Sequence, residues 1–456
     1  MRDAINRSNP QCKIIIICIG SLITPFAFAQ EPLSIDETVA YVLSHSSGFS
    51  QSRAALASKQ EYLLAEQRKS WPTLKGELTV LHGSGKPTSF SAVNGQQDPD
   101  APTIASLKGE YGVGTLTLST PIFQNGAFFF QKAPAELMAE ESYYKAQSDA
   151  NTQAAELAND VAKAYLNALS TADQLVLLKN AYDKDQQRLD AVQKRVRAGL
   201  ATHSEELNVK ASLAEKLAAL NAAQRLHAYQ HILLAFALGI SADTTVELIP
   251  VPAAFPNAPA MDQLLKTTVD THPALRTQMS NLKISTSVLA LERAENLPKV
   301  TFDIKHTEAG DFYTTGTHQF TSVGFNLLMT LMDSGQTRAK SRARGYEIEE
   351  NKEILSQTRT KVMQDIYHAY FAYQNAVDTY DASKATIDKT TAQAQESVAK
   401  HNKNLISLDT LLHDETAALE SQITHINRRY AAWIAWADFI TSLGQTYSSS
   451  LNSALP

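Results

Sequence analysis

The clearest candidates for chemistry in this sequence are two histidines, His227 and His231, which lie one helical turn apart in the stretch HAYQH. Imidazole is a common zinc ligand, so the pair could bind a metal ion. However, no acidic residue or cysteine lies nearby in the sequence to complete a four-ligand site. We therefore interpret both histidines as packed or solvent-exposed side chains, and we predict no metal site.

Catalytic signatures are missing elsewhere as well. Both cysteines, Cys12 and Cys18, lie before residue 30, so a chain that loses this segment has no thiol nucleophile, thiolate metal site or disulfide. The sequence contains no GxxxxGK[ST] phosphate-binding loop and no triad-like arrangement. A formal net charge of −6 gives no electrostatic support to nucleic-acid binding. The sequence predicts a protein that is not an enzyme, needs no cofactor and binds no nucleic acid.

The N-terminal segment, residues 1–29, has the pattern of a secretory signal peptide. Basic residues precede a short apolar run over residues 14–23, and Ala27 and Ala29 then form an A-x-A cleavage site. Cleavage after Ala29 leaves 38 basic and 46 acidic residues. A membrane anchor is the alternative, but the apolar run is short for one. No later segment has 18 consecutive apolar residues, so only a β-structure is predicted to enter a membrane.

The rest of the chain follows the same plan twice. Each half has a short helix, a break, a second helix, two strands and a long helical region. His45 and His272 mark the break at an offset of 227, and Pro72 and Pro298 precede the first strand at an offset of 226. The boundaries that we predict are a first repeat at 30–239, a proline-rich linker at 240–260, a second repeat at 261–444 and a tail at 445–456.

Each repeat contains two predicted strands in which apolar and polar residues alternate. They span about 73–82 and 113–123 in the first repeat, and about 299–306 and 321–332 in the second, separated by polar loops. The residues assigned to the membrane-facing sides are Leu74, Leu78, Val80, Leu116, Leu118, Val300, Phe302, Ile304, Phe325, Leu327, Met329 and Leu331. Strands of about ten residues are long enough to cross a bilayer when tilted.

Long helical hairpins follow the strands. Residues 135–198 contain neither Gly nor Pro, and neither do residues 346–443. Turns are predicted at about 198–203 and 401–408, where each helix reverses. Repeated alanine pairs along these segments favour close packing of antiparallel helices.

Four membrane strands cannot enclose a pore, and their open edges in lipid would leave backbone groups unpaired. Several chains must therefore share strands, and three chains would supply twelve. The predicted fold is mainly α with a β-barrel part. It has two tandem structural repeats, each with two membrane strands and a long α-helical hairpin. The predicted assembly is a trimer that shares a 12-stranded barrel and a helical tunnel.

In this order, the elements resemble the TolC-like outer membrane efflux protein family over about residues 33–444. The motifs that carry the resemblance are LSIDETV (33–39), PIFQNG (121–126), RAGLA (197–201) and LMDSG (331–335). The resemblance implies a homotrimer in the outer membrane of a Gram-negative bacterium, in contact with outer membrane lipid. It also implies that the helices lie in the periplasm, where an adaptor and an inner membrane pump, proton-driven or of ABC type, dock at their tip.

The resemblance further implies roles for the two hairpin turns. The implied adaptor-docking residues are Gly199, Leu200, Ala201, Thr202, Asn404, Leu405, Ile406 and Ser407. Asn404 stands where the family usually has glycine, but asparagine tolerates the left-handed conformation. Some family members close the tip with rings of aspartate. The best alignment places Thr410 and His413 at those positions. Asp409 fits only after a shift of one residue, and Glu205 occupies the corresponding acidic place in the first repeat. These four residues are the candidate pore gate.

The leading functional prediction is a passive exit duct for small molecules or drugs in a tripartite efflux system. An outer membrane component of type I protein secretion is the alternative. A third possibility is a periplasmic coiled-coil protein that forms no channel, although two hairpins and four lipid-compatible strands argue against it.

Overall fold

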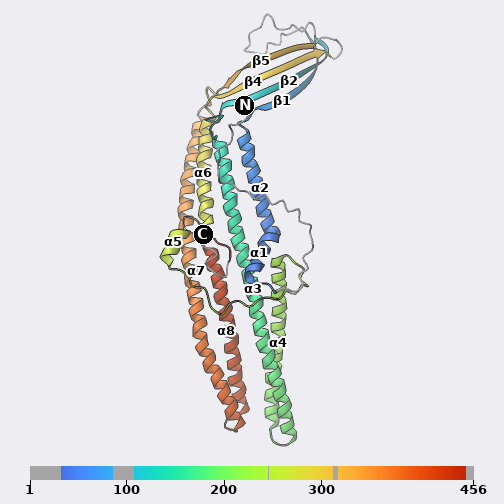
Figure 1. Cartoon of the computed structure of the whole chain (residues 1–456), viewed down its shortest axis with the longest axis vertical. Coiled ribbons are helices and arrows are strands. Elements are labelled where there is room, and N and C mark those ends of the chain that lie inside the picture. The colour runs from blue at the N-terminus through green and yellow to red at the C-terminus, as the bar shows by residue number, and fades with distance from the viewer. Residues whose placement is uncertain (1–31, 86–106, 245, 312–316, 448–456) are drawn as a thin grey trace, which may run out of the picture.

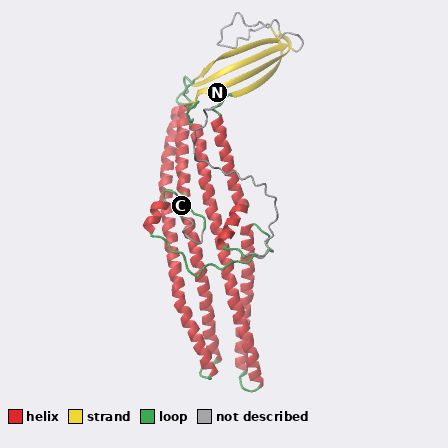
Figure 2. Cartoon of the chain, in the orientation of Figure 1, coloured by secondary structure: helices red, strands yellow, loops and turns green. Residues whose placement is uncertain are grey.

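The computed structural model describes residues 32–85, 107–244, 246–311 and 317–447, which form a long helical rod with a β-sheet at one end (Figures 1 and 2). Several sequence predictions lie outside these residues. They are the cleavage site at Ala27 and Ala29, most of the first polar loop, and most of the tail.

The helices, in chain order, are α1 (Ile35–His45), α2 (Ser47–Arg68), α3 (Pro134–Arg197), α4 (His203–Leu238), α5 (Met261–Thr268), α6 (Pro273–Ala294), α7 (Gln336–Asn402) and α8 (Leu408–Ser442). The strands are β1 (Thr73–Gly85), β2 (Leu107–Gln124), β3 (Ala127–Phe128), β4 (Lys299–Asp311) and β5 (Thr317–Leu328). Helices α2, α3, α6 and α7 form the half of the rod next to the sheet. Helices α3, α4, α7 and α8 form the distal half (Figure 1).

The longest helices, α3 with 64 residues and α7 with 67, begin with clear start signals. Pro134 occupies the first turn of α3, where its fixed φ suits a helix and its missing N–H costs nothing. Asp333 caps α7 by accepting hydrogen bonds from the backbone N–H groups of Gly335 and Thr337, each at 2.9 Å. Both helices end in basic residues, which suit the negative end of a helix dipole.

The four long strands form one antiparallel sheet in the order β1-β2-β4-β5, and the short β3 pairs with the end of β2. The sheet joins the two repeats, because β2 of the first repeat pairs with β4 of the second. All four strands extend further into the loops than the sequence predicted, since β1 reaches Gly85, β2 starts at Leu107, β4 reaches Asp311 and β5 starts at Thr317.

The predicted extent of the last strand was wrong at its C-terminal end. Strand β5 stops at Leu328, which pairs with Lys299 at the start of β4. The next residue of β4 toward the N-terminus would be Pro298, which has no N–H to donate to a further ladder position. Met329 and Leu331 therefore lie beyond the strand, although their alternation continues the strand pattern.

The largest core lies midway along the rod, around the buried Trp433 and Trp436 of α8. Segments from the linker wrap this level and are held by tyrosines of the long helices. The Tyr165 hydroxyl of α3 lies 2.7 Å from the carbonyl oxygen of Leu33 and 2.8 Å from that of Ile249. The Tyr373 hydroxyl of α7 donates to the Pro256 carbonyl at 2.5 Å. These hydrogen bonds therefore attach the linker to both repeats.

Candidate functional site

One face of the sheet is apolar across all four strands. In the register, Leu74 faces Leu118, Leu118 faces Ile304, and Ile304 faces Val323, so these four side chains form a row on the same face. The other residues of this face that the sequence predicted are Leu78, Val80, Leu116, Val300, Phe302, Phe325 and Leu327. Val323 belongs to the same row, as the alternation of apolar residues along its strand indicates.

This apolar face is largely open in the single chain. Leu78 is 75% exposed and Phe325 is 74% exposed. The opposite face carries the polar residues of the same strands, including Lys75, Asp303 and Lys305. There the Ser119 hydroxyl donates to the Asp303 carboxylate at 2.5 Å. A sheet with one polar face and one exposed apolar face can separate water from lipid.

Aromatic side chains gather where the sheet meets the helices. Phe128 stacks on Phe130 with ring centroids 5.6 Å apart, and Phe129 meets Phe130 edge to face at 5.3 Å. These three side chains and Trp71 are all exposed. Exposed aromatic rings at this level are typical of the boundary between lipid and water.

The opposite end of the rod is formed by the two hairpin turns. Gly199 and Asn404 occupy equivalent positions, 205 residues apart, and both have a left-handed backbone, with φ of 71° and 55°. After each turn a hydroxyl caps the next helix: the backbone N–H of Glu205 donates to Thr202 Oγ1 at 3.2 Å, and that of Thr410 donates to Ser407 Oγ at 3.1 Å. The two turns are therefore built on one plan.

The remaining predicted docking residues project from these turns. Leu200 is 71% exposed and Leu405 is 67% exposed, whereas Ala201 and Ile406 are half-buried. A small apolar cluster just above the turns joins the two hairpins, and its buried members are Val192, Val209, Leu408, Leu411 and Leu412. The turns of the two repeats thus belong to one end surface of the molecule.

The four gate candidates lie in the first two turns of α4 and α8. Asp409, Thr410 and His413 are exposed, and Glu205 is half-buried. An acidic side chain in a first turn also stabilises the helix dipole without any role in a gate. The single chain therefore brings the candidates to the correct end of the rod, and a gate role for them stays a prediction.

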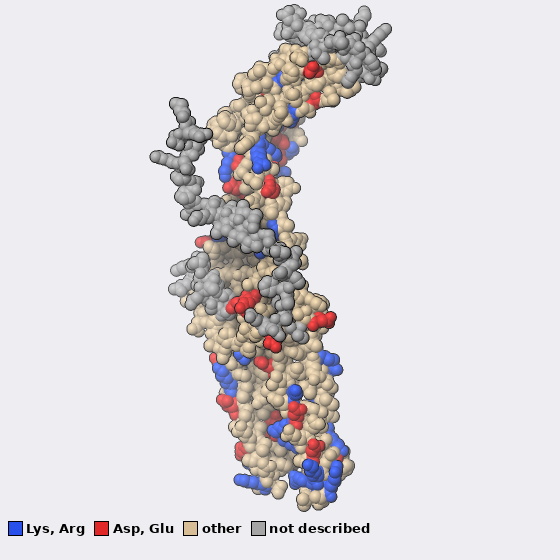
Figure 3. All heavy atoms as spheres, turned by 45° about the vertical axis from the view of Figure 1, so that its right-hand side comes forward, with Lys and Arg blue, Asp and Glu red and all other residues tan. Residues whose placement is uncertain are grey.

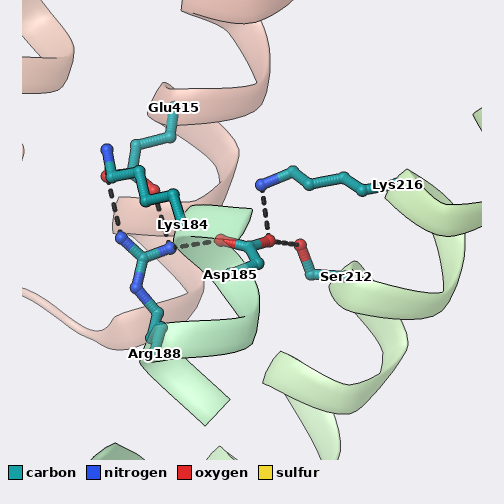
Figure 4. A network of polar contacts seen from close by, with 6 residues as sticks. All are labelled: Lys184, Asp185, Arg188, Ser212, Lys216 and Glu415. Carbon is teal, nitrogen blue, oxygen red and sulfur yellow. Dashed lines mark hydrogen bonds and ion pairs between the residues drawn. The ribbon is translucent and has the colours of Figure 1, made fainter. Parts of the chain in front are cut away.

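A buried polar network connects the hairpins further up the rod (Figure 4). Asp185 of α3 is fully buried and lies 2.8 Å from Arg188 Nη1, 2.5 Å from Lys216 Nζ and 2.8 Å from Ser212 Oγ. Arg188 also contacts Glu415 of α8, with Nη1 2.7 Å from Oε2. Lys184 Nζ lies 2.7 Å from Glu415 Oε1. Helices α3, α4 and α8 are therefore held together by charge.

Burial alone would raise the pKa of the Glu415 carboxyl, but Arg188 and Lys184 outweigh it and hold this pKa below its ordinary value. Glu415 is therefore ionised at neutral pH. The network borders a groove of about 380 Å³ between the hairpins, which is lined by residues of α3, α4, α7 and α8, including Lys184, Lys216 and Glu415. Sequence reasoning missed this network, because its members lie far apart in the chain.

The second repeat has an uncharged equivalent of part of this network. The residues 205 positions after Asp185 and Lys216 are Thr390 and Ser421, whose hydroxyl oxygens lie 2.6 Å apart. In the same hairpin, buried Asp414 accepts hydrogen bonds from Gln393, at 2.8 Å, and from Ser397. The first hairpin therefore contains a buried ion pair where the second contains a neutral hydrogen bond.

His227 and His231 lie on α4, with ring centroids 4.5 Å apart, and His227 Nδ1 lies 3.2 Å from Thr171 Oγ1. Partial burial lowers the pKa of both imidazoles. Within the ranges that the structure describes, no three His, Cys, Asp or Glu side chains come together as a metal site. The same described part of the chain contains no helix that is long and apolar enough to span a bilayer.

Comparison with known proteins agrees with this architecture. The chain is 23% identical over 325 residues to protein CyaE of Bordetella pertussis, an alignment that covers 69% of this chain and 68% of CyaE. The CmeC outer membrane channel of Campylobacter jejuni has a similar structure, with a TM-score of 0.71, 13% identity, and coverage of 90% of this chain and 85% of CmeC. A membrane protein from Pseudomonas aeruginosa gives a TM-score of 0.73 at 15% identity, over 90% of this chain and 93% of that protein.

The sequence model of the family described as "Outer membrane efflux protein" matches residues 42–240 and 264–445, one segment in each repeat. The resemblance inferred from the sequence is thereby confirmed, and so is the mainly helical fold with two repeats and a strand sheet. The chain belongs to the outer membrane efflux protein family, whose members are outer membrane channels and not enzymes.

Proposed function

We propose that three copies of this chain form a passive exit duct of a tripartite efflux system. Each chain contributes its four long strands to a twelve-stranded barrel in the outer membrane. The helices continue the duct into the periplasm, where the hairpin turns dock onto an adaptor protein and an inner membrane pump. The pump supplies the energy, and small molecules are the cargo.

The observation that carries this proposal is the open, two-sided sheet. Its order leaves one edge of β1 and one edge of β5 without a strand partner among the described residues. Its apolar face, represented by Leu78 and Phe325, is exposed along the strands. Unpaired edges are unstable in lipid, whereas a shared barrel pairs every edge. Twelve strands leave a hollow interior, whereas four cannot close a barrel and eight leave room only for side chains or one small ligand.

The docking part of the proposal is supported by the two matching turns. They lie at the end of the rod farthest from the sheet (Figure 1) and expose Leu200 and Leu405 at equivalent positions. Exposed leucines at the tip of a rigid hairpin suit insertion into an apolar pocket of a partner. Gly199, Ala201, Thr202, Asn404, Ile406 and Ser407 would shape the same surface.

The first experiment is to measure the oligomer mass of the protein extracted in detergent from isolated outer membranes. A trimer in that fraction supports the shared barrel, whereas a monomer in the soluble periplasmic fraction contradicts it. Cargo is then tested with a deletion strain. Accumulation of small toxic compounds would support small-molecule efflux, and loss of one secreted protein without such accumulation would favour type I secretion instead.

A further inference from the structure

The two hairpin turns at the distal end of the rod are basic, although the chain as a whole is acidic. Resting on the docking role proposed above, we propose that this end binds a partner protein whose docking tip carries acidic side chains around an apolar socket. Leu200 and Leu405 enter the socket, and the surrounding basic side chains of both turns pair with the carboxylates. The partner is thereby defined by its chemistry, which the docking role alone leaves open.

The charge distribution in the sequence carries the first step. Residues 194–204 contain three basic residues and no acidic one, and residues 400–408 contain two basic residues and no acidic one. The whole chain has a net charge of −6. The five basic residues are Lys194, Arg195, Arg197, Lys400 and Lys403. Figure 3 shows basic side chains at this end of the molecule.

These charges are available to a partner. All five side chains are exposed. Lys400 is paired with Glu396 at 2.7 Å, and Arg195 contacts the Leu200 carbonyl oxygen at 3.4 Å. Across the described residues, no carboxylate pairs with Lys194, Arg197 or Lys403. The nearest acidic residues in sequence after each turn, Glu205 and Asp409, belong to the next helices.

The arrangement of the turns carries the second step. The apolar cluster above them packs α4 of the first hairpin against α8 of the second, so both basic turns face the same partner surface. Each exposed leucine directly follows the left-handed residue of its turn, Gly199 or Asn404. An apolar centre with a charged rim is the usual composition of a protein docking site.

Basic residues at the C-terminal end of a helix also stabilise that helix through its dipole. This alternative explains Lys194, Arg195, Arg197 and Lys400, which lie in the last turns of α3 and α7. It applies to stability alone, however, and predicts no dependence of partner binding on these residues. The two explanations therefore differ in what they predict for a variant that folds normally.

The test uses the full-length protein in cells and in detergent. A photo-reactive amino acid at Leu200 first identifies the adaptor that contacts the tip. Binding of that adaptor is then measured for the triple variant K194Q/R197Q/K403Q at low and high salt. The matched control is K179Q/R225Q/K389Q, which neutralises exposed basic residues of α3, α4 and α7 away from the turns.

We expect the tip variant to bind about tenfold more weakly at low salt, because each exposed ion pair contributes little and three are lost. The difference should shrink at high salt, where the charges are screened. The control should bind normally. Reversing the tip charges (K194E/R197E/K403E) should be rescued by replacing acidic residues of the adaptor tip with lysine.

Each of the following outcomes would contradict one part of the proposal. Adaptor cross-linking with binding that is insensitive to tip charge rejects the acidic partner but leaves the docking role intact. Absence of any adaptor cross-link at Leu200 rejects the docking role itself. Tip-dependent binding to vesicles of phosphatidylglycerol, with unchanged adaptor binding, would assign the basic surface to an anionic membrane instead.

Discussion

Arg188 of α3 and Glu415 of α8 form an ion pair between the two repeats, with Nη1 2.7 Å from Oε2. The pair is mostly shielded from water and lies between the central core and the turns. Glu415 also forms an ion pair with Lys184, and Arg188 also forms one with Asp185. A substitution at one of these residues therefore alters contacts among three helices. The network therefore adds to the attachment of the first hairpin to the second that the apolar cluster above the turns provides.

We predict that E415Q destabilises the folded protein by about 1–3 kcal/mol at neutral pH, the range for a charged hydrogen-bonding group. The pKa of Glu415 is lower in the folded chain than in the unfolded chain. Its contribution is therefore present above about pH 4.3 and is lost as the pH falls through the folded pKa. Thermal unfolding in detergent from pH 7 to pH 3 should show a shrinking difference between E415Q and the parent. A constant difference over that range would contradict this assignment.

The internal repeat provides a design for replacing the buried ion pair. D185T should destabilise by about 3–5 kcal/mol, because it leaves the buried Lys216 without its partner. K216S should cost less, because Asp185 keeps its ion pair with Arg188. The double variant D185T/K216S reproduces Thr390 and Ser421 of the second hairpin and should be less unstable than D185T alone, because the buried lysine is removed with its partner. The exposed pair Lys384–Asp381 is the control, and D381N should change stability by less than about 0.5 kcal/mol. Additive single effects would count against a coupled pair.

Two glycines with the same backbone conformation should respond differently to alanine. Gly199 and Gly444 both have φ of 71°, but a Cβ at Gly199 meets open space, while one at Gly444 would overlap the Pro273 ring. G199A should cost about 1–2 kcal/mol from the left-handed backbone alone, and G444A should cost more. N404G should be nearly neutral, because asparagine already tolerates this conformation. Equal losses for G199A and G444A in thermal unfolding would show that the Pro273 contact is unimportant.

Acidification should weaken the first hairpin through its histidine pair. Partial burial lowers the pKa of His227 and His231 in the folded chain, so the unfolded chain takes up protons first as the pH falls. Stability supplied by the neutral imidazoles is complete above about pH 6.5 and declines below it. The variant H227Q/H231Q should therefore lose less stability than the parent between about pH 6.5 and pH 5. Identical pH profiles in thermal unfolding would exclude this contribution.

The two faces of β1 should tolerate a lysine very differently. Leu78 lies on the apolar face and Thr79 on the polar face. If the apolar face contacts lipid, L78K should destabilise the barrel by about 2–4 kcal/mol near the membrane centre and reduce the trimer recovered from outer membranes. T79K is the matched control and should assemble normally. Equal recovery of both variants would contradict a lipid contact at Leu78.

Much of this architecture could be predicted from local sequence patterns. The Ser34 cap is a good example, because its side chain and Glu37 form the reciprocal hydrogen bonds that their spacing predicts. The long helices follow from segments without proline. The alternation of apolar residues also identified one face of the sheet, but it failed at Met329 and Leu331, since local periodicity contains no information about where the neighbouring strand begins.

The polar network illustrates the opposite case. Asp185, Lys216 and Glu415 resemble ordinary surface charges in the sequence, and only the packing of α3, α4 and α8 buries them together. The alignment of the two repeats gave one indication that Asp185 and Lys216 form a pair. Both align, at an offset of 205 residues, with Thr390 and Ser421 in the second hairpin. The gate candidates stay predictions for a related reason: which side chains face a pore depends on neighbouring copies of the chain.

The unbroken length of α3 has a consequence for the cell envelope. At about 1.5 Å per residue, its 64 residues set a span of about 96 Å between the sheet and the turn. No proline interrupts this span, and α7 has a similar length of 67 residues, so the two long helices fix the distance between the sheet and the turns. The turn is held at a fixed depth below the sheet, and any partner anchored in the opposite membrane must cover the remaining distance with its own structure.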